Sequence, residues 1–166
     1  MMVATFFVVL AISLLVAFFA NKRSEQHSKR QTVELILVAL LVANGVMLIF
    51  GGFTHIINPS FVAKDIGWPT STRFQFEVGI ANIAIGVVLV GCLRKRQDWM
   101  LAAIVASSIW IFGDGIGHII SHQDTGNSDP GNWGIALNVV YAANAVAIAL
   151  YVWLRVLRSR EQKAAV

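Results

Sequence analysis

The sequence VELILVALLVANGVMLIFGGF, residues 33–53, contains a single charged residue, Glu34, among side chains that are otherwise almost all apolar or small. A helix needs about 20 consecutive, mostly apolar residues to cross the ~30 Å hydrocarbon layer of a membrane. Four further stretches of the chain meet this requirement. We therefore predict five membrane-spanning helices, at residues 2–20, 33–53, 74–93, 99–120 and 133–154.

The composition of the 166 residues excludes an ordinary soluble domain. The mean hydropathy is +0.68. Only 13% of the residues are charged, whereas soluble domains have about 25%. The one cysteine, Cys92, cannot form a disulfide within the chain. The predicted fold is all-α, with one helical membrane domain over residues 1–166, the last four spans forming a compact bundle and the first lying at its periphery.

Lysine and arginine are distributed unevenly among the connections. Of the 13 such residues, only Lys64 and Arg73 fall on the side predicted to hold the N-terminus. Short cytoplasmic loops carry the excess of positive charge, so we expect the N-terminus outside and the C-terminus inside, in a plasma membrane or bacterial inner membrane. Basic residues beside a membrane bind anionic lipid. The expected partners are therefore the lipid bilayer and other membrane subunits or further copies of the chain, and not nucleic acid.

A few ionisable side chains interrupt the apolar spans. A charge at the centre of a membrane helix costs about 2.5–3.5 kcal/mol on insertion scales, so such residues are rare. Glu77, Asp114 and His118 lie inside predicted spans, while His55 and His122 lie just beyond span ends. In the predicted orientation all five fall in the outer half of the membrane or at its outer surface. Because a helix repeats every 3.6 residues, Asp114, His118 and His122 share one face.

Three short motifs carry a resemblance to a known family. They are Gly67-Trp68-Pro69, the run Phe74-Gln75-Phe76-Glu77-Val78-Gly79 followed by Asn82, and Pro130-Gly131-Asn132. Over about residues 33–154 the chain resembles a family of small bacterial polytopic membrane proteins of unknown function. The resemblance implies a helical membrane fold and carries no activity with it.

The polar residues and the motifs together predict a pocket in the outer half of the membrane, capped by the Gly67-Trp68-Pro69 loop and the Pro130-Gly131-Asn132 turn. We expect it to bind a small ligand or a metal, or to belong to an accessory subunit of a membrane complex. The expected pocket residues are His55, Trp68, Gln75, Glu77, Asn82, Asp114, His118 and Asn132.

A haem- or metal-dependent oxidoreductase component is the main alternative. Imidazoles and carboxylates are common ligands of zinc, copper and iron. The candidate ligands are His55, Glu77, Asp114, His118 and His122, and His55 and His118 are the candidate axial ligands of a haem. A transmembrane proton or substrate pathway is disfavoured, because the inner halves of the spans contain only asparagine and serine as polar residues.

A purely structural role for the polar residues is the other alternative. Asparagine side chains can hydrogen-bond between membrane helices, and small residues allow those helices to approach closely. Gly79 and Gly86 on one span, and the G-x-x-x-G of Gly113 and Gly117 on the next, predict such contacts. No hydrolase, metalloprotease or phosphate-loop motif occurs, so the sequence favours a protein that is not an enzyme.

Overall fold

The computed structural model describes residues 2–22 and 28–164, and every regular element in these two ranges is a helix. This confirms the all-α class. The elements are α1 (Met2–Lys22), α2 (Lys29–Ile57), α3 (Pro59–Ile66), α4 (Thr72–Val90), the 3-10 turn η1 (Gly91–Leu93), α5 (Asp98–Thr125), α6 (Pro130–Trp133) and α7 (Ile135–Ala164).

Four helical segments in the described ranges are long and apolar enough to cross a membrane: Lys29–Ile57, Thr72–Leu93, Asp98–Thr125 and Pro130–Ala164. They contain the last four predicted spans. The first predicted span is also helical, within α1 (21 residues). The structure therefore supports a multi-pass membrane protein with four candidate spans.

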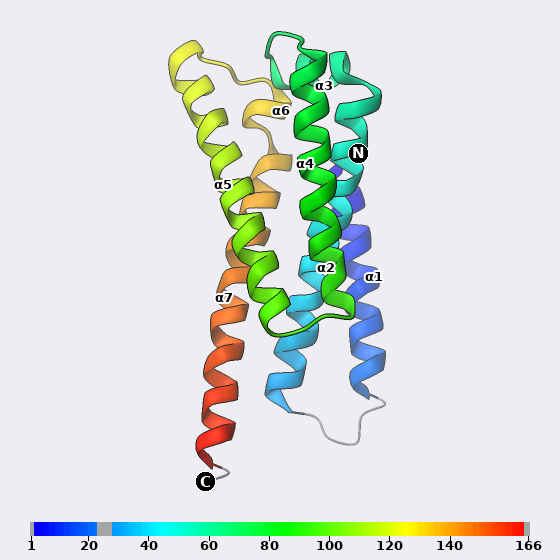
Figure 1. The fold of residues 1–166 in the computed structure, drawn as a ribbon, viewed down its shortest axis with the longest axis vertical. Helices are drawn as coiled ribbons and strands as arrows, with labels where there is room; N and C mark the ends of the chain where they lie inside the picture. Colours follow the sequence, from blue (N-terminus) through cyan, green and yellow to red (C-terminus); the bar gives the residue numbers. More distant parts are fainter. Residues whose placement is uncertain (1, 23–27, 165–166) are drawn as a thin grey trace.

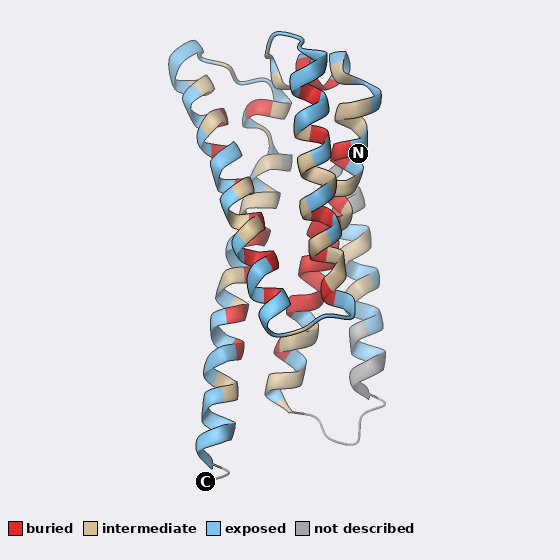
Figure 2. Cartoon of the chain, viewed as in Figure 1, coloured by how far each residue is buried: buried red, intermediate tan, exposed pale blue. Residues whose placement is uncertain are grey.

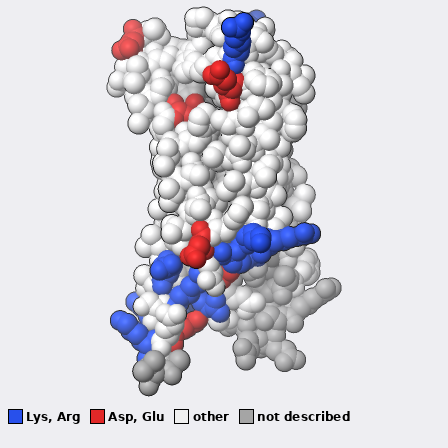
Figure 3. All heavy atoms as spheres, in the orientation of Figure 1, with Lys and Arg blue, Asp and Glu red and all other residues white. Residues whose placement is uncertain are grey.

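The long helices run antiparallel to their neighbours along the chain and form one bundle (Figure 1). The short helices α3 and α6 lie together at one end, which we call the capped end. Basic side chains gather at the opposite end, the basic end, and few are visible at the capped end (Figure 3). The predicted segregation of positive charge is thus present in the structure. The helix α1 packs on α2 and α7, at the edge of the bundle.

Two pairs of glycines bring α2 and α4 into close contact. A Cβ atom built on Gly45 would lie 2.7 Å from the carbonyl oxygen of Gly86, and one built on Gly52 would lie 2.5 Å from the carbonyl oxygen of Gly79. Only glycine permits backbones to approach this closely. The predicted packing role of Gly79 and Gly86 is confirmed, and their partners are glycines too.

The predicted packing role of Gly113 and Gly117 is wrong. A Cβ atom on Gly113 would meet nothing within 4 Å, and one on Gly117 would meet only the Trp68 ring, at 3.9 Å. The glycine of α5 that is tightly packed is Gly115, whose Cβ would lie 2.9 Å from the ring of Tyr141 on α7. The G-x-x-x-G spacing failed because α5 diverges from α4 toward the capped end (Figure 1).

The half of the bundle nearer the basic end is filled by apolar side chains. Buried residues line the inward faces of the helices there (Figure 2). We call this cluster the apolar plug; its fully buried members include Leu37, Leu41, Met100 and Leu154, each 0% exposed. They come from α2, α5 and α7, so the plug joins three of the candidate spans.

A network of ion pairs lies next to the plug at the basic end. The Glu34 carboxylate lies 3.1 Å from an Arg158 guanidinium nitrogen and 3.4 Å from Nε of Arg96. Arg30 lies 3.7 Å from Glu34 and 2.8 Å from Glu161. The network ties the start of α2 to the end of α7 and to the connection before α5. Glu34, the one charged residue in the apolar sequence 33–53, thus has three arginines as partners.

Candidate functional site

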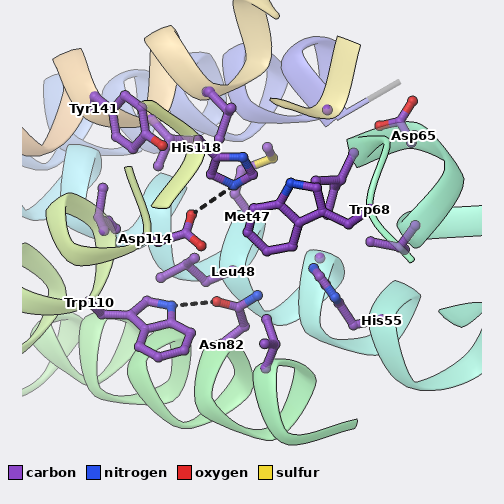
Figure 4. Close-up of a pocket in the computed structure, with 18 of the residues that line it drawn as sticks. Met47, Leu48, His55, Asp65, Trp68, Asn82, Trp110, Asp114, His118 and Tyr141 are labelled. Carbon is purple, nitrogen blue, oxygen red and sulfur yellow. Dashed lines mark hydrogen bonds and ion pairs between the residues drawn. The ribbon is translucent and has the colours of Figure 1, made fainter. Parts of the chain in front are cut away.

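A cavity of about 190 Å³ lies between the apolar plug and the cap, lined by residues of every helix from α2 to α7 except the η1 turn (Figure 4). Its volume is below the ~300–1,000 Å³ of pockets for drug-sized ligands and cofactors, so the cavity suits a smaller molecule. Of the predicted pocket residues, the lining includes His55, Trp68, Asn82, Asp114 and His118.

The cap forms where the two predicted loop segments meet. The indole Nε1 of Trp68 donates a hydrogen bond of 3.0 Å to Ser121 Oγ on α5. The Trp68 ring stacks on the His118 imidazole with 5.2 Å between ring centroids. Gly67 ends α3 with a φ of 74°, a left-handed conformation that glycine adopts without steric penalty. This turn directs Trp68 over the cavity.

The orientation of the His118 ring is fixed by Asn132, which is 0% exposed. The amide nitrogen of Asn132 donates to the carbonyl oxygens of Asn127, at 2.9 Å, and of His118, at 3.3 Å. Its amide oxygen therefore faces Nδ1 of His118, at 2.8 Å. Because an amide oxygen only accepts hydrogen bonds, Nδ1 of His118 carries the proton and donates it. Asn132 thus positions His118 from behind the cavity wall.

The other ring nitrogen of His118 faces a carboxylate. Nε2 of His118 lies 3.5 Å from Oδ2 of Asp114, one helical turn away on α5 (Figure 4). With Nδ1 protonated, a neutral His118 presents only a lone pair at Nε2, and an ionised Asp114 also only accepts. The contact is favourable only if a hydrogen lies between the two groups. A protonated imidazole or carboxyl would supply that hydrogen, and a bound molecule that donates to both groups would serve equally.

His55 also contacts a buried amide, that of Gln75 on α4, although the Gln75 nitrogen has no partner among the described residues. Its Nδ1 lies 2.6 Å from Oε1 of Gln75, whose side chain is 0% exposed. With that oxygen accepting, Nδ1 donates and Nε2 of His55 is left as an acceptor in the cavity lining. Gln75 does not line the cavity; it orients a residue that does. The predicted pocket therefore separates into residues that reach the cavity and residues that hold them.

Two buried asparagines on the inward faces of the bundle differ in their partners. Asn144 is 1% exposed. Its amide oxygen accepts from Ser107 at 3.1 Å and its amide nitrogen donates to Ser108 at 2.9 Å, which joins α7 to α5. Asn44 is also 1% exposed and lines the cavity, yet neither its amide oxygen nor its nitrogen has a partner among the described residues. Asn144 is therefore structural, and Asn44 has unused capacity for hydrogen bonds.

Aromatic rings cover much of the remaining lining. Trp68, Phe74, Trp110 and Tyr141 all contribute. The Trp110 Nε1 donates a hydrogen bond of 2.7 Å to Oδ1 of Asn82, so both side chains are fixed (Figure 4). The Tyr141 hydroxyl has no partner among the described residues. Sequence reasoning missed Trp110 and Asp65 as lining residues, although the helical spacing that linked Asp114 to His118 also places Trp110 one turn before Asp114.

Besides Gln75 and Asn132, two more of the predicted residues lie outside the cavity lining. Glu77 is exposed and is not part of the lining, because a residue two positions after Gln75 points to a different side of α4. His122 stacks on Trp133 with 4.2 Å between ring centroids, and its Nδ1 lies 3.0 Å from the carbonyl oxygen of Asn127. It belongs to the cap.

The predicted metal ligands are consequently not gathered at one point. Within the described ranges, no group of three or more histidine, cysteine, aspartate or glutamate side chains is close enough to hold a metal ion. Asp114 and His118 lie together, whereas Glu77 and His122 lie elsewhere. The metal hypothesis receives no support from this geometry.

Residues 2–160 match a family described as a family of unknown function, DUF6790. The chain belongs to the DUF6790 family. The match covers nearly the whole sequence, including every cavity residue, so the cavity lies within the part of the chain that defines membership. No curated protein and no solved structure is significantly similar to this DUF6790 protein.

Proposed function

We propose that this DUF6790 protein is a multi-pass membrane protein that binds a small organic amine in its protonated form. The observation that carries the proposal is the facing pair of Asp114 Oδ2 and His118 Nε2, 3.5 Å apart. A direct N–H···O bond is typically 2.7–3.2 Å long. An ammonium group in the cavity that contacts both atoms would donate a hydrogen bond to each of them.

The charge and the aromatic lining of the cavity favour a cation over a neutral donor. Asp65 and Asp114 line the cavity, and no lysine or arginine of the described residues does. Aromatic faces attract ammonium groups, with an energy of about 2 kcal/mol or more when the site is desolvated. Asn44 would accept a further hydrogen bond through its amide oxygen. The carboxylates, the aromatic rings and the Asn44 amide thus all favour a cationic ligand that donates hydrogen bonds.

The placement in the membrane is part of the proposal. With the basic end on the cytoplasmic side, as the distribution of lysine and arginine favours, the cavity lies in the outer half of the bilayer. The five-span topology with the N-terminus outside adds α1 as a fifth crossing. A plasma membrane or bacterial inner membrane would fit this arrangement.

A metal or haem site remains the second candidate, for one reason. The Nδ1 atoms of His55 and His118 are both tied to amide oxygens, and metal-binding histidines usually have such a hydrogen bond behind them. A haem is disfavoured by volume, because the cavity of about 190 Å³ lies below the ~300–1,000 Å³ of cofactor pockets. A role as an accessory subunit is compatible with amine binding.

The test compares three molecules of similar size, butylammonium, butanol and butyrate, by calorimetric titration of protein in lipid nanodiscs. We expect butylammonium to bind most tightly and butyrate not to bind. Asp114→Asn should weaken butylammonium at least about tenfold, since hydrogen bonds to charged groups contribute ~1.5–3 kcal/mol. Glu77→Gln is the matched control, because it removes an exposed carboxylate outside the cavity. Equal affinities for the three molecules would contradict the proposal.

Elemental analysis of protein purified without a histidine tag or chelator tests the second candidate. Near-stoichiometric zinc, copper or iron that is lost in His118→Ala would favour the metal site over the amine site. The same preparation without metal, combined with butylammonium binding, would favour the amine.

A further inference from the structure

A second hollow lies beside the cavity, between α4 and α5. Its volume is about 520 Å³, and its lining is mostly apolar. It shares Trp68, Phe74, Val78, Trp110 and Asp114 with the cavity, so the two spaces adjoin. The residues that line this cleft alone are Ile85, Ala106, Ile109, Gly113 and Gly117.

The cleft exists because α4 and α5 separate toward the capped end (Figure 1). No side chain fills the space in front of Gly113, where a Cβ atom would meet nothing within 4 Å. The space-filling view shows a recess in the upper part of this face, with carboxylate-bearing residues visible in it (Figure 3). The opening between the two helices is therefore a feature of the molecular surface.

The carboxylate of Asp114 reaches both spaces. Its side chain is 41% exposed, whereas that of its neighbour His118 is 6% exposed. Its surroundings on α5 are apolar, with Ile109 at 73% and Ile116 at 58% exposure. In a helix that is long enough to cross a membrane, such a face meets lipid, where an unpaired charge is costly. Asp114 thus lies where a cation arriving from the lipid phase would meet it first.

From these observations we infer that the cleft between α4 and α5 is a lateral opening to the bilayer and the binding site of a hydrocarbon chain. The ligand would be an amphiphilic alkylamine, with its ammonium group at Asp114 and His118 and its single chain between α4 and α5. This inference rests on the proposed amine site and adds the substrate class and the route of access. The hydrocarbon chain of the ligand packs against Trp110 and Ile109, and Gly113 leaves room for it.

A photoreactive amine tests the inference. The probe is decylammonium with a diazirine in the middle of its chain, added to protein in lipid nanodiscs, followed by illumination and peptide mapping by mass spectrometry. We expect cross-links concentrated on the cleft-lining residues of α4 and α5. Asp114→Asn should remove most of them, because the head group is no longer held.

Gly113→Leu separates the chain site from the amine site. It places a side chain in the open space of the cleft, so it should reduce cleft cross-links at least about fivefold and leave butylammonium affinity unchanged. Ala106→Leu, on the same wall, serves as a second variant. Folding of each is checked by size-exclusion chromatography and melting temperature.

The possible outcomes distinguish the two proposals. If butylammonium binds but decylammonium cross-links are spread over the lipid-facing surface and are indifferent to Asp114→Asn and Gly113→Leu, the lateral opening is wrong and the amine site stands. If neither amine binds, the proposed function fails and the inference fails with it. Cross-links in the cleft that are lost in both Asp114→Asn and Gly113→Leu support both the amine site and the lateral opening.

Discussion

The two halves of the bundle are built from the same long helices, but the space between these helices is filled in one half and hollow in the other. Toward the basic end, Leu37, Leu41, Met100 and Leu154 are 0% exposed and fill the space between helices. Toward the capped end, the space between the same helices holds a cavity of about 190 Å³. On α2 the boundary between the filled half and the hollow half lies within one turn, because Leu41 belongs to the plug and Asn44 lines the cavity.

The hydrogen-bond partners of a buried polar group distinguish a packing role from a binding role. Asn144 and Asn44 are equally buried, at 1% exposure each. Asn144 shares its hydrogen bonds with two serines of α5, whereas Asn44 has no partner among the described residues. An unpaired buried polar group costs about 1–3 kcal/mol. A ligand that satisfies Asn44 would recover part of that free energy.

The largest effect is expected where the helices meet most closely. Gly52→Leu would place a side chain against the carbonyl oxygen of Gly79, which a Cβ alone would approach to 2.5 Å. Neither backbone can move aside without separating α2 from α4. We expect destabilisation of at least about 3 kcal/mol, at the upper end of overpacking effects, and loss of most of the monodisperse protein in size-exclusion chromatography.

Gly113→Leu is the control for this prediction, because the same substitution there meets open space. It should leave the yield and the melting temperature unchanged or slightly raised, since leucine has a higher helix propensity than glycine. Equal losses in the two variants would show that the α2–α4 contact is not specially tight.

A loss of stability that leaves the protein monodisperse is expected from the plug. Leu41→Ala removes a fully buried side chain and should lower the free energy of unfolding in detergent by about 2–5 kcal/mol, measured by denaturant titration. Because Leu41 does not line the cavity, butylammonium affinity should remain within about twofold of the original. A large loss of affinity would mean that the two halves are energetically coupled.

The smallest change, and one of opposite sign, is expected one turn further along α2. Asn44→Leu replaces an unpaired buried amide by an apolar side chain of similar size and should raise the free energy of unfolding by about 1–3 kcal/mol. Butylammonium binding should weaken at the same time. A drop in stability would instead indicate that Asn44 bonds between helices as Asn144 does, and would favour the structural alternative.

The fold was largely predictable because apolar length is encoded locally. Residues 33–53 show their membrane character without knowledge of any partner, and the last four predicted spans fall within the four candidate membrane helices. The helical repeat also predicted that Asp114 and His118 lie on one face, and they do lie together.

The details of the site depended on contacts between helices, which the sequence does not display. Gln75 and Glu77 are both polar and two residues apart, yet Gln75 is buried against His55 and Glu77 is exposed. Only the rotation of α4 against its neighbours decides between them. Likewise, because α5 diverges from α4, Gly113 and Gly117 line a cleft and do not pack against a neighbouring helix.

The apolar plug also determines which compartment a bound molecule can sample. Leu37, Leu41, Met100 and Leu154 fill the space between the cavity and the basic end, so a ligand of the proposed site would exchange at the capped end or between α4 and α5. If the proposed amine site is correct, its occupancy would follow the ligand concentration at the capped end and in the leaflet around it. Transport to the other side of the membrane would require the plug to open.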